Sequence, residues 1–192
     1  SGGQEPTLTI QDFSALIPSS LLDQSGAVFY SGERAFRGTA AVYLLGLNPG
    51  GDPLKMNSET VARHTDGVLA TKPSDWSEYR DESWNKRPPG QAGLQPRVLH
   101  LLDQLKLDPG QVPSSNVVFR RTARQKGLTP SFSELADLCW PLHQAVVDRL
   151  RPKLVVCFGR MAGHYVVNRL GANHVEDEVE DNRRRWKNSL YR

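Results

Sequence analysis

Three short apolar segments, each followed directly by a glycine or by polar residues, constrain the fold of this chain more than any other feature. They are centred on residues 40–45, 116–119 and 154–158. Apolar segments of this length are typical of strands that are buried on both faces, as in a parallel sheet. We therefore expect an α/β fold with three strands, the second of them extending over residues 112–119.

Helical patterns separate the expected strands. The leucine and valine spacing in residues 94–105 predicts an amphipathic helix, and a second is expected over residues 131–150. Ser131 and Glu134 have the spacing of a capping box at the start of that second helix. A third helix is expected over residues 160–170. Alternating strands and helices are typical of an open sheet with right-handed crossovers.

The remaining segments carry weaker patterns. Residues 46–90 show little periodicity and read as one long functional or mobile connection. We expect residues 1–39 to wrap around the domain, and residues 172–192 to form a polar tail that is first acidic and then rich in arginine. A length of 192 residues fits a single domain spanning the whole sequence.

Composition excludes several classes of protein. No apolar stretch approaches the roughly 18 to 20 residues that a membrane span needs. The two cysteines, Cys139 and Cys157, are too few for a disulfide framework or a four-cysteine cluster, so we expect buried free thiols, a reducing cytoplasm and no cofactor. Cys139 and His143 have a spacing that can hold a metal, but no second pair completes the ligand set, and we expect no metal site.

The charge permits a nucleic-acid partner without requiring one. Lys and Arg number 24 against 21 Asp and Glu. The basic residues gather in two places, within residues 120–126 and within residues 183–187. Such clusters are typical of contacts with phosphates.

Ligands of open α/β sheets bind outside the carboxyl ends of the strands, which draws attention to the segments that follow them. The first is Gly46-Leu47-Asn48-Pro49-Gly50-Gly51-Asp52, which matches neither a phosphate-binding loop nor a dinucleotide fingerprint. Its glycines allow close approach of a ligand, although an ordinary tight turn would use the same residues. Asn116 is a polar residue in an otherwise apolar strand, and a buried amide needs a partner from the backbone or from a ligand.

These segments together resemble the uracil-DNA glycosylase superfamily. Residues 46–50 look like its first active-site motif in the Gly-x-Asn-Pro-Gly form. The order of an Asn-Val-Val strand, a helix, an Arg-Pro-Lys turn, a strand and Gly-x-x-Ala over residues 116–163 is similar to the small microbial branches. The resemblance covers roughly residues 40–171. It implies a three-layer sandwich around a short, mainly parallel sheet.

The resemblance also implies roles for individual residues. Asn48 matches the catalytic position that orients the attacking water, and Asn116 matches the amide that reads the base. Gly50 stands where the strictest branch carries a tyrosine that blocks the thymine methyl, which implies a broader substrate range. The implied base-binding set is Gly46, Leu47, Gly50, Asn116, Trp84 and Tyr79, with Trp76 as a further stacking candidate and the choice among the aromatic residues left open. The implied DNA-binding set is Arg120, Arg121, Arg124, Lys126 and Arg160.

The chain departs from the superfamily in one important respect. The second active-site motif, a His-Pro-Ser or similar loop after a fourth strand, has no match after Gly171. We hypothesise that the sequence stops before that strand, and that a longer chain or another molecule supplies it.

The leading hypothesis is a DNA-repair hydrolase of the uracil-DNA glycosylase type, cytoplasmic or nucleoid-associated in a bacterium, and monomeric. It would act on DNA that contains uracil or a related damaged base. Two other readings stay open. One is a catalytically impaired member of the same fold that binds nucleic acid or protein, and the other is an α/β domain that binds a small anionic metabolite at residues 50–51.

Overall fold

The computed structural model describes residue 3 and residues 8–192, so part of the expected N-terminal wrapping segment, residues 1–2 and 4–7, lies outside the described residues. The elements are, in chain order, α1 (Ile10–Ser14), η1 (Ser19–Leu21), η2 (Glu33–Phe36), β1 (Val42–Gly46), α2 (Val61–Ala70), α3 (Glu78–Asp81), α4 (Gln95–Gln104), η3 (Pro109–Gln111), β2 (Ser114–Asn116), α5 (Gln125–Leu128), η4 (Thr129–Ser131), α6 (Phe132–Leu150), β3 (Leu154–Cys157), α7 (Arg160–Leu170), β4 (His174–Val179) and β5 (Lys187–Tyr191).

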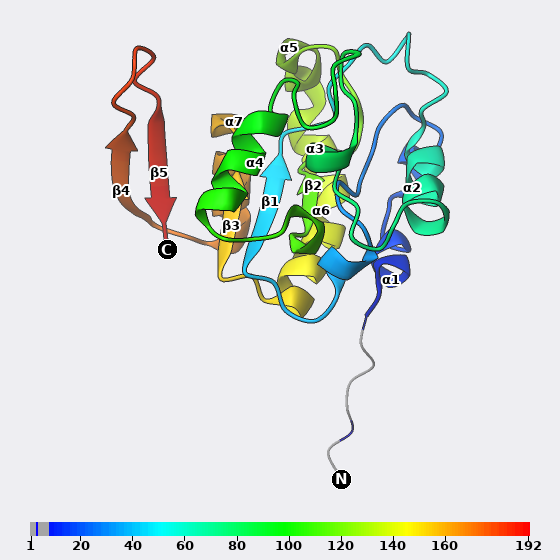
Figure 1. Ribbon diagram of the computed structural model, residues 1–192, viewed down its shortest axis with the longest axis horizontal. Helices are drawn as coiled ribbons and strands as arrows, with labels where there is room; N and C mark the ends of the chain where they lie inside the picture. The colour runs from blue at the N-terminus through cyan, green and yellow to red at the C-terminus, as the bar shows by residue number, and fades with distance from the viewer. Residues whose placement is uncertain (1–2, 4–7) are drawn as a thin grey trace.

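The main sheet has three parallel strands in the order β2-β1-β3 (Figure 1). Leu45 of β1 is paired with Ser115 of β2 on one side and with Cys157 of β3 on the other. The strand β1 is therefore hydrogen-bonded on both edges, whereas β3 lies at an edge of this sheet. This architecture confirms the expected α/β class and the parallel arrangement of the three strands.

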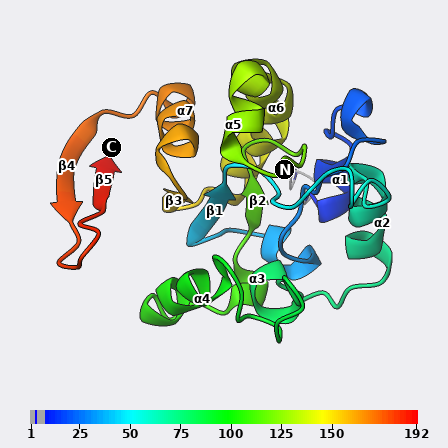
Figure 2. The same cartoon turned by 90° about the horizontal axis from the view of Figure 1, so that it is seen from above.

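Alternate side chains of β1 enter two different apolar clusters. Tyr43 and Leu45 pack with residues of α6 and α7, and Val42 and Leu44 pack with residues of α4. Figure 2 shows α3 and α4 on one face of the sheet and α5, α6 and α7 on the other. Because both faces are covered, every residue of β1 is apolar or glycine and buried.

Several boundaries follow the sequence pattern closely. The strand β1 ends at Gly46, α4 covers Gln95–Gln104, and α7 covers Arg160–Leu170. Gly171 ends α7 with a positive φ of 64°, a conformation that glycine adopts without steric cost. In the N-terminal segment, α1 inserts Ile10 and Phe13 into the core.

Residues 46–90, expected to form one long functional or mobile connection, contain the helices α2 and α3, which the sequence pattern did not predict. The Thr60 side chain caps α2 by accepting a hydrogen bond from the Arg63 N–H. Only Val61, Thr65 and Val68 of α2 are buried, so the apolar pattern is weak.

The second strand is shorter than expected. The strand β2 covers only Ser114–Asn116, and not residues 112–119. Beyond Asn116 the chain follows the loop that leaves β1, with the N–H of Val117 bound to the Gly46 carbonyl and the N–H of Val118 bound to the Leu47 carbonyl.

The capping box at Ser131 was also a wrong expectation. Ser131 precedes α6, but its side chain makes no cap hydrogen bond, and its hydroxyl accepts one from the Arg120 guanidinium at 3.1 Å. A tertiary contact has replaced the local one.

The expected polar tail forms an antiparallel hairpin of β4 and β5 that stands apart from the main sheet (Figure 1). Apart from the half-buried Tyr191, the residues of both strands are exposed. The sequence therefore shows no alternation of apolar and polar residues that would predict these strands. Cross-strand contacts support the hairpin instead, since Asp177 accepts a hydrogen bond from Ser189 and pairs with Lys187.

Within the described residues no helix is both long and apolar enough to cross a membrane. The two cysteines are free thiols, as expected, with Cys139 buried and Cys157 half-buried. Burial raises the pKa of each thiol to about 12, which keeps both in the unreactive protonated form.

His143 joins α6 to the sheet rather than to a metal. Its Nδ1 lies 2.7 Å from the Tyr43 hydroxyl and its Nε2 lies 3.3 Å from the Val117 carbonyl. A carbonyl only accepts, so Nε2 carries the proton and Nδ1 accepts from the tyrosine. Burial lowers the pKa of His143 to about 4.

This arrangement predicts a loss of stability in mild acid. The unfolded chain binds a proton at His143 near its ordinary pKa of about 6.5, whereas the folded protein does so only near 4. The free energy of unfolding should therefore fall by up to about 3 kcal/mol between these pH values. Chemical denaturation of the natural protein and of His143→Gln checks this: the gap between their stabilities should narrow as the pH falls. Parallel pH curves for the two proteins would contradict it.

Candidate functional site

The candidate site lies at the carboxyl ends of β1 and β2, where two loops leave the sheet side by side. The strand register places Gly46, the last residue of β1, directly opposite Asn116, the last residue of β2. The predicted loop with Asn48 and the predicted base-reading residue Asn116 are therefore brought together by the sheet itself.

Gly46 and Asn116 are matched in shape. A Cβ atom added at Gly46 would lie 2.4 Å from Asn116 Oδ1, so the amide occupies the space that any other side chain would need. Asn116 is only 3% exposed, and its buried Nδ2 makes no hydrogen bond of good geometry in the described part of the chain, although the Tyr30 hydroxyl lies beside it. An unpartnered buried amide is unfavourable, and native structures contain few of them.

Asn48 is held in one orientation by its own amide hydrogens. Its Nδ2 donates to the Arg120 carbonyl at 3.0 Å and to the Thr122 hydroxyl at 2.8 Å. Both partners belong to the loop that follows β2. The amide oxygen of Asn48 is therefore the group left to bind a further donor such as water.

A cavity of about 580 Å³ lies beside these loops, a size typical of small-ligand sites. Its lining includes Gly50, Gly51 and Arg121 from the two loops, together with Tyr30 and His64. Neither Asn48 nor Asn116 lines the cavity. Tyr30 connects the two regions, because it lines the cavity and its hydroxyl lies beside the Asn116 amide.

The Tyr30 hydroxyl stays protonated. Burial is the main cause that raises its pKa, and the negative charge of Glu78 adds to it, against smaller opposing effects of Asn116 and Arg121. A protonated phenol can both donate and accept, which makes Tyr30 a polar group available between the cavity and Asn116.

The aromatic candidates take different positions. Trp84 and Trp76 line the cavity, and carboxylates accept hydrogen bonds from their indole nitrogens: Glu78 from Trp84 at 2.9 Å, and Glu82 from Trp76 at 2.8 Å. Tyr79 is buried and does not line the cavity, and its ring lies edge-on to Trp84 at a centroid distance of 5.8 Å. Of the two aromatic residues in the expected base-binding set, Trp84 lines the cavity, and Tyr79 packs against Trp84.

Arg121 organises the glycine loop. Its side chain is only 8% exposed and donates to the Gly50 carbonyl and to the Ser25 hydroxyl. Gly51 adopts a φ of 106°, and a Cβ there would lie 2.5 Å from the Met56 sulfur and 3.4 Å from the Arg121 guanidinium. The prediction that Arg121 contacts DNA stays a prediction, but its placement is that of a residue that positions the loop.

The other basic residues differ in exposure. Arg124, Lys126 and Arg160 are exposed, whereas Arg120 is half-buried and bonded to Ser131. Leu47 is half-buried, and its carbonyl binds the Val118 N–H.

Sequence reasoning missed Tyr30, His64, Glu78 and Glu82 as cavity residues. His64 lies on α2 with its Nε2 3.7 Å from a Glu78 carboxylate oxygen, and its buried Nδ1 has no partner in the described residues. The sequence does contain a pattern that predicts the helix carrying His64. Thr60 is a favourable N-cap residue, and the valines at positions 61 and 68 lie on one face of the helix that follows. In the described part of the chain, no group of three or more His, Cys, Asp or Glu side chains is placed to hold a metal.

No protein-family model matches this chain, and a comparison with curated proteins finds no match.

The contact between Gly46 and Asn116 predicts that Gly46→Ala destabilises the protein by about 1–3 kcal/mol, because the added methyl group overlaps the amide. Adding Asn116→Ala should recover part of that loss, since it removes the overlapping atom. Gly50→Ala is the matched control, because a Cβ at Gly50 meets nothing within 4 Å. Thermal unfolding measures all four proteins. Equal losses of stability in Gly46→Ala and Gly50→Ala would contradict the close contact between Gly46 and Asn116.

Proposed function

We propose that this protein is a DNA glycosylase of the uracil-DNA glycosylase type, which extrudes uracil or a related damaged base and hydrolyses its N-glycosidic bond. The observation that carries the proposal is the buried Asn116 amide over Gly46, whose Nδ2 makes no hydrogen bond of good geometry, at the carboxyl end of the sheet where Asn48 is also held. The resemblance of residues 40–171 to that superfamily supports the same assignment.

Asn116 has the chemistry to select the base. An amide offers one acceptor and two donor hydrogens, which complement the N3–H and O4 of uracil. Cytosine presents the opposite pattern and would leave buried groups unmet, at a cost of about 1–3 kcal/mol each. The unpartnered Nδ2 is the donor that such a base would satisfy.

Asn48 has the chemistry to place the water. Since its amide hydrogens are donated to Arg120 and Thr122, its oxygen can accept a hydrogen bond from a water molecule. The water oxygen forms a bond to C1′ as the bond from C1′ to the base nitrogen breaks, and the base leaves with the electron pair. An amide cannot take the water proton, which passes to solvent or to the departing base. Slow hydrolysis is therefore expected.

The surrounding features fit a DNA substrate. Arg124, Lys126 and Arg160 are exposed for contact with phosphates, which predicts binding that weakens steeply with salt. As part of the proposal, the fold is the three-layer sandwich of the superfamily, with a further strand against β3. The position of β3 at a sheet edge and the 42% exposure of Leu154 support such a strand.

The first test is uracil excision. The protein is incubated with single- and double-stranded oligonucleotides that carry uracil, and abasic sites are then cleaved with alkali. Strand scission should occur and should fall by about 10²-fold or more in Asn48→Ala, because the water loses its position. Asn57→Ala, an exposed asparagine in the same loop region, is the control and should retain the activity. Unchanged scission in Asn48→Ala overturns the role of this residue. Binding without scission would assign the non-catalytic alternative, and the absence of both would point to a small-molecule site.

A second test concerns the range of bases. Gly50 lines the cavity, and its α-carbon faces open space. Gly50→Tyr should therefore fill part of the cavity and reduce excision of 5-substituted pyrimidines about tenfold or more relative to uracil. Gly50→Ala should leave that ratio unchanged. An unaltered ratio in Gly50→Tyr would show that the base does not occupy this cavity.

A further inference from the structure

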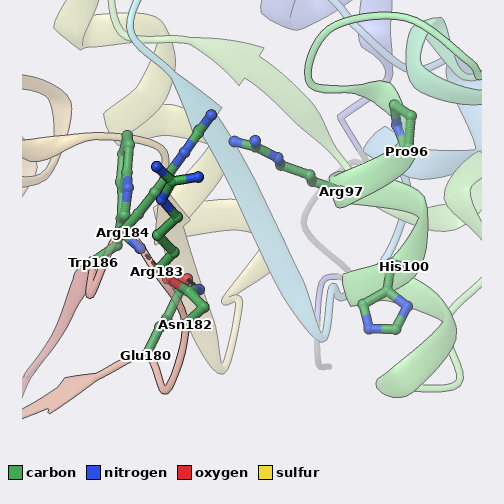
Figure 3. A pocket seen from close by; sticks show the side chains of 8 residues that line it. All are labelled: Pro96, Arg97, His100, Glu180, Asn182, Arg183, Arg184 and Trp186. Carbon is green, nitrogen blue, oxygen red and sulfur yellow. Dashed lines mark hydrogen bonds between the residues drawn. The ribbon is translucent and has the colours of Figure 1, made fainter.

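A second cavity lies between α4 and the turn that joins β4 to β5 (Figure 3). Its volume is about 630 Å³. It is lined by Pro96, Arg97 and His100 of α4 and by Glu180, Asn182, Arg183, Arg184 and Trp186 of the hairpin turn. The arginine cluster of residues 183–187, which the proposed site does not use, therefore forms one wall of a cavity.

Positive charge converges on this cavity from two elements that are distant in the sequence. Figure 3 shows Arg97 extending from α4 toward the side of the gap that carries Arg183 and Arg184. Among residue 3 and residues 8–192, no carboxylate lies within ion-pair distance of these three guanidinium groups. The one carboxylate in the lining, Glu180, accepts a hydrogen bond from Asn182.

Like charges that converge with no carboxylate at ion-pair distance repel each other, and a bound anion relieves that repulsion. The turn is also organised in advance. The Asn182 side-chain oxygen accepts hydrogen bonds from the backbone N–H groups of Arg184, at 2.9 Å, and Arg185, at 3.0 Å. The Glu180 N–H closes the turn on the Trp186 carbonyl at 2.8 Å. An ordered turn loses less conformational entropy when its arginines bind.

Trp186 adds a flat apolar surface to the cationic turn. Its side chain is 56% exposed, and no other ring of the described residues stacks on it. An exposed tryptophan beside several arginines combines the two elements of single-stranded nucleic-acid sites, a stacking surface for bases and cations for the backbone.

The position of the turn connects it to the proposed site. Figure 1 shows the turn at the same end of the molecule as the carboxyl end of β1 and the helix α5, which carries Lys126. Glu176, Asp177 and Glu178 lie along the strand β4, where Asp177 is already paired with His174 and Lys187, whereas Glu180 and Asp181 lie in the turn beside its arginines. The three arginines of the turn, Arg183 to Arg185, outnumber its two carboxylates, whereas β4 carries three carboxylates, so the turn is the part of the hairpin that attracts a polyanion.

We propose that the turn between β4 and β5, together with Arg97 of α4, binds the phosphate backbone of a single DNA strand, with Trp186 stacking on one of its bases. The choice of DNA as the polyanion rests on the proposed glycosylase function. The turn would hold the strand that flanks the extruded base, and it would act on binding rather than on the chemical step.

The test measures binding to an oligonucleotide that contains no uracil, by fluorescence anisotropy over a range of salt concentrations. Arg183→Glu/Arg184→Glu should weaken binding and reduce the slope of log affinity against log salt by about 2, one for each lost phosphate contact. Lys106→Glu/Lys153→Glu is the control, because it makes the same change of charge at exposed lysines that lie beyond the carboxyl end of α4 and before β3, at the opposite end of the sheet. Trp186→Ala should weaken binding to single strands about fivefold or more, and Trp186→Phe should restore most of it.

The outcomes separate this inference from the proposed function. If the protein excises uracil, and the double arginine variant binds DNA as tightly as the double lysine control, the hairpin site is overturned and the glycosylase proposal stands. If the arginine pair alone weakens binding but uracil is never excised, the hairpin site stands and the glycosylase proposal falls. If the natural protein binds no DNA at low salt, the hairpin site is overturned directly.

Discussion

The strand β1 is hydrogen-bonded to β2 on one edge and to β3 on the other, and both of its faces are buried in apolar clusters. These constraints fix where its last residue, Gly46, lies relative to Asn116 at the end of β2. The two loops that follow are then tied to each other by Asn48, Arg120 and Thr122. The geometry of the candidate site is thus a consequence of the sheet, since a slip in strand register would separate the two asparagines.

Buried polar groups near the candidate site differ from those elsewhere in the protein in whether they have hydrogen-bond partners. Away from the cavity they are satisfied: the Ser115 hydroxyl donates to the Val28 carbonyl at 2.6 Å, and the Ser31 hydroxyl accepts a hydrogen bond from the Ser114 N–H at 3.0 Å. The buried side-chain atoms that lack a partner in the described residues belong to Asn116, His64 and Thr65, which lie on β2 and α2 at or near the cavity. Proteins retain such unfavourable groups where a ligand completes them, which is the physical basis of the proposed base site.

The sequence pattern predicted the parts of the fold that depend on continuous apolar burial. The limits of β1 and α7 follow from apolar residues and terminal glycines. Asn116 was singled out as an amide in an apolar strand, but β2 consists of Ser114, Ser115 and Asn116, and the apolar residues 117–119 lie beyond it. The elements it missed lack such burial, because α2 buries only three residues and the β4–β5 hairpin is almost wholly exposed. Tertiary contacts of side chains also could not be predicted from the sequence. Ser131 bonds to Arg120 instead of capping α6, and the buried Arg121 side chain donates a hydrogen bond to the Gly50 carbonyl. The cavity needs Tyr30 and His64, which come from segments without a recognisable motif.

The central claim is that the Asn116 amide reads a base. The most direct measurement is the side-chain amide signal of Asn116 in an NMR spectrum, assigned with Asn116→Ala, during titration with an oligonucleotide that carries a non-hydrolysable 2′-fluorinated deoxyuridine. The account predicts a large shift of this signal with the deoxyuridine and a much smaller one with the matching deoxycytidine. An Asn116 signal that stays in place while the oligonucleotide binds, or that moves equally with both bases, would contradict it.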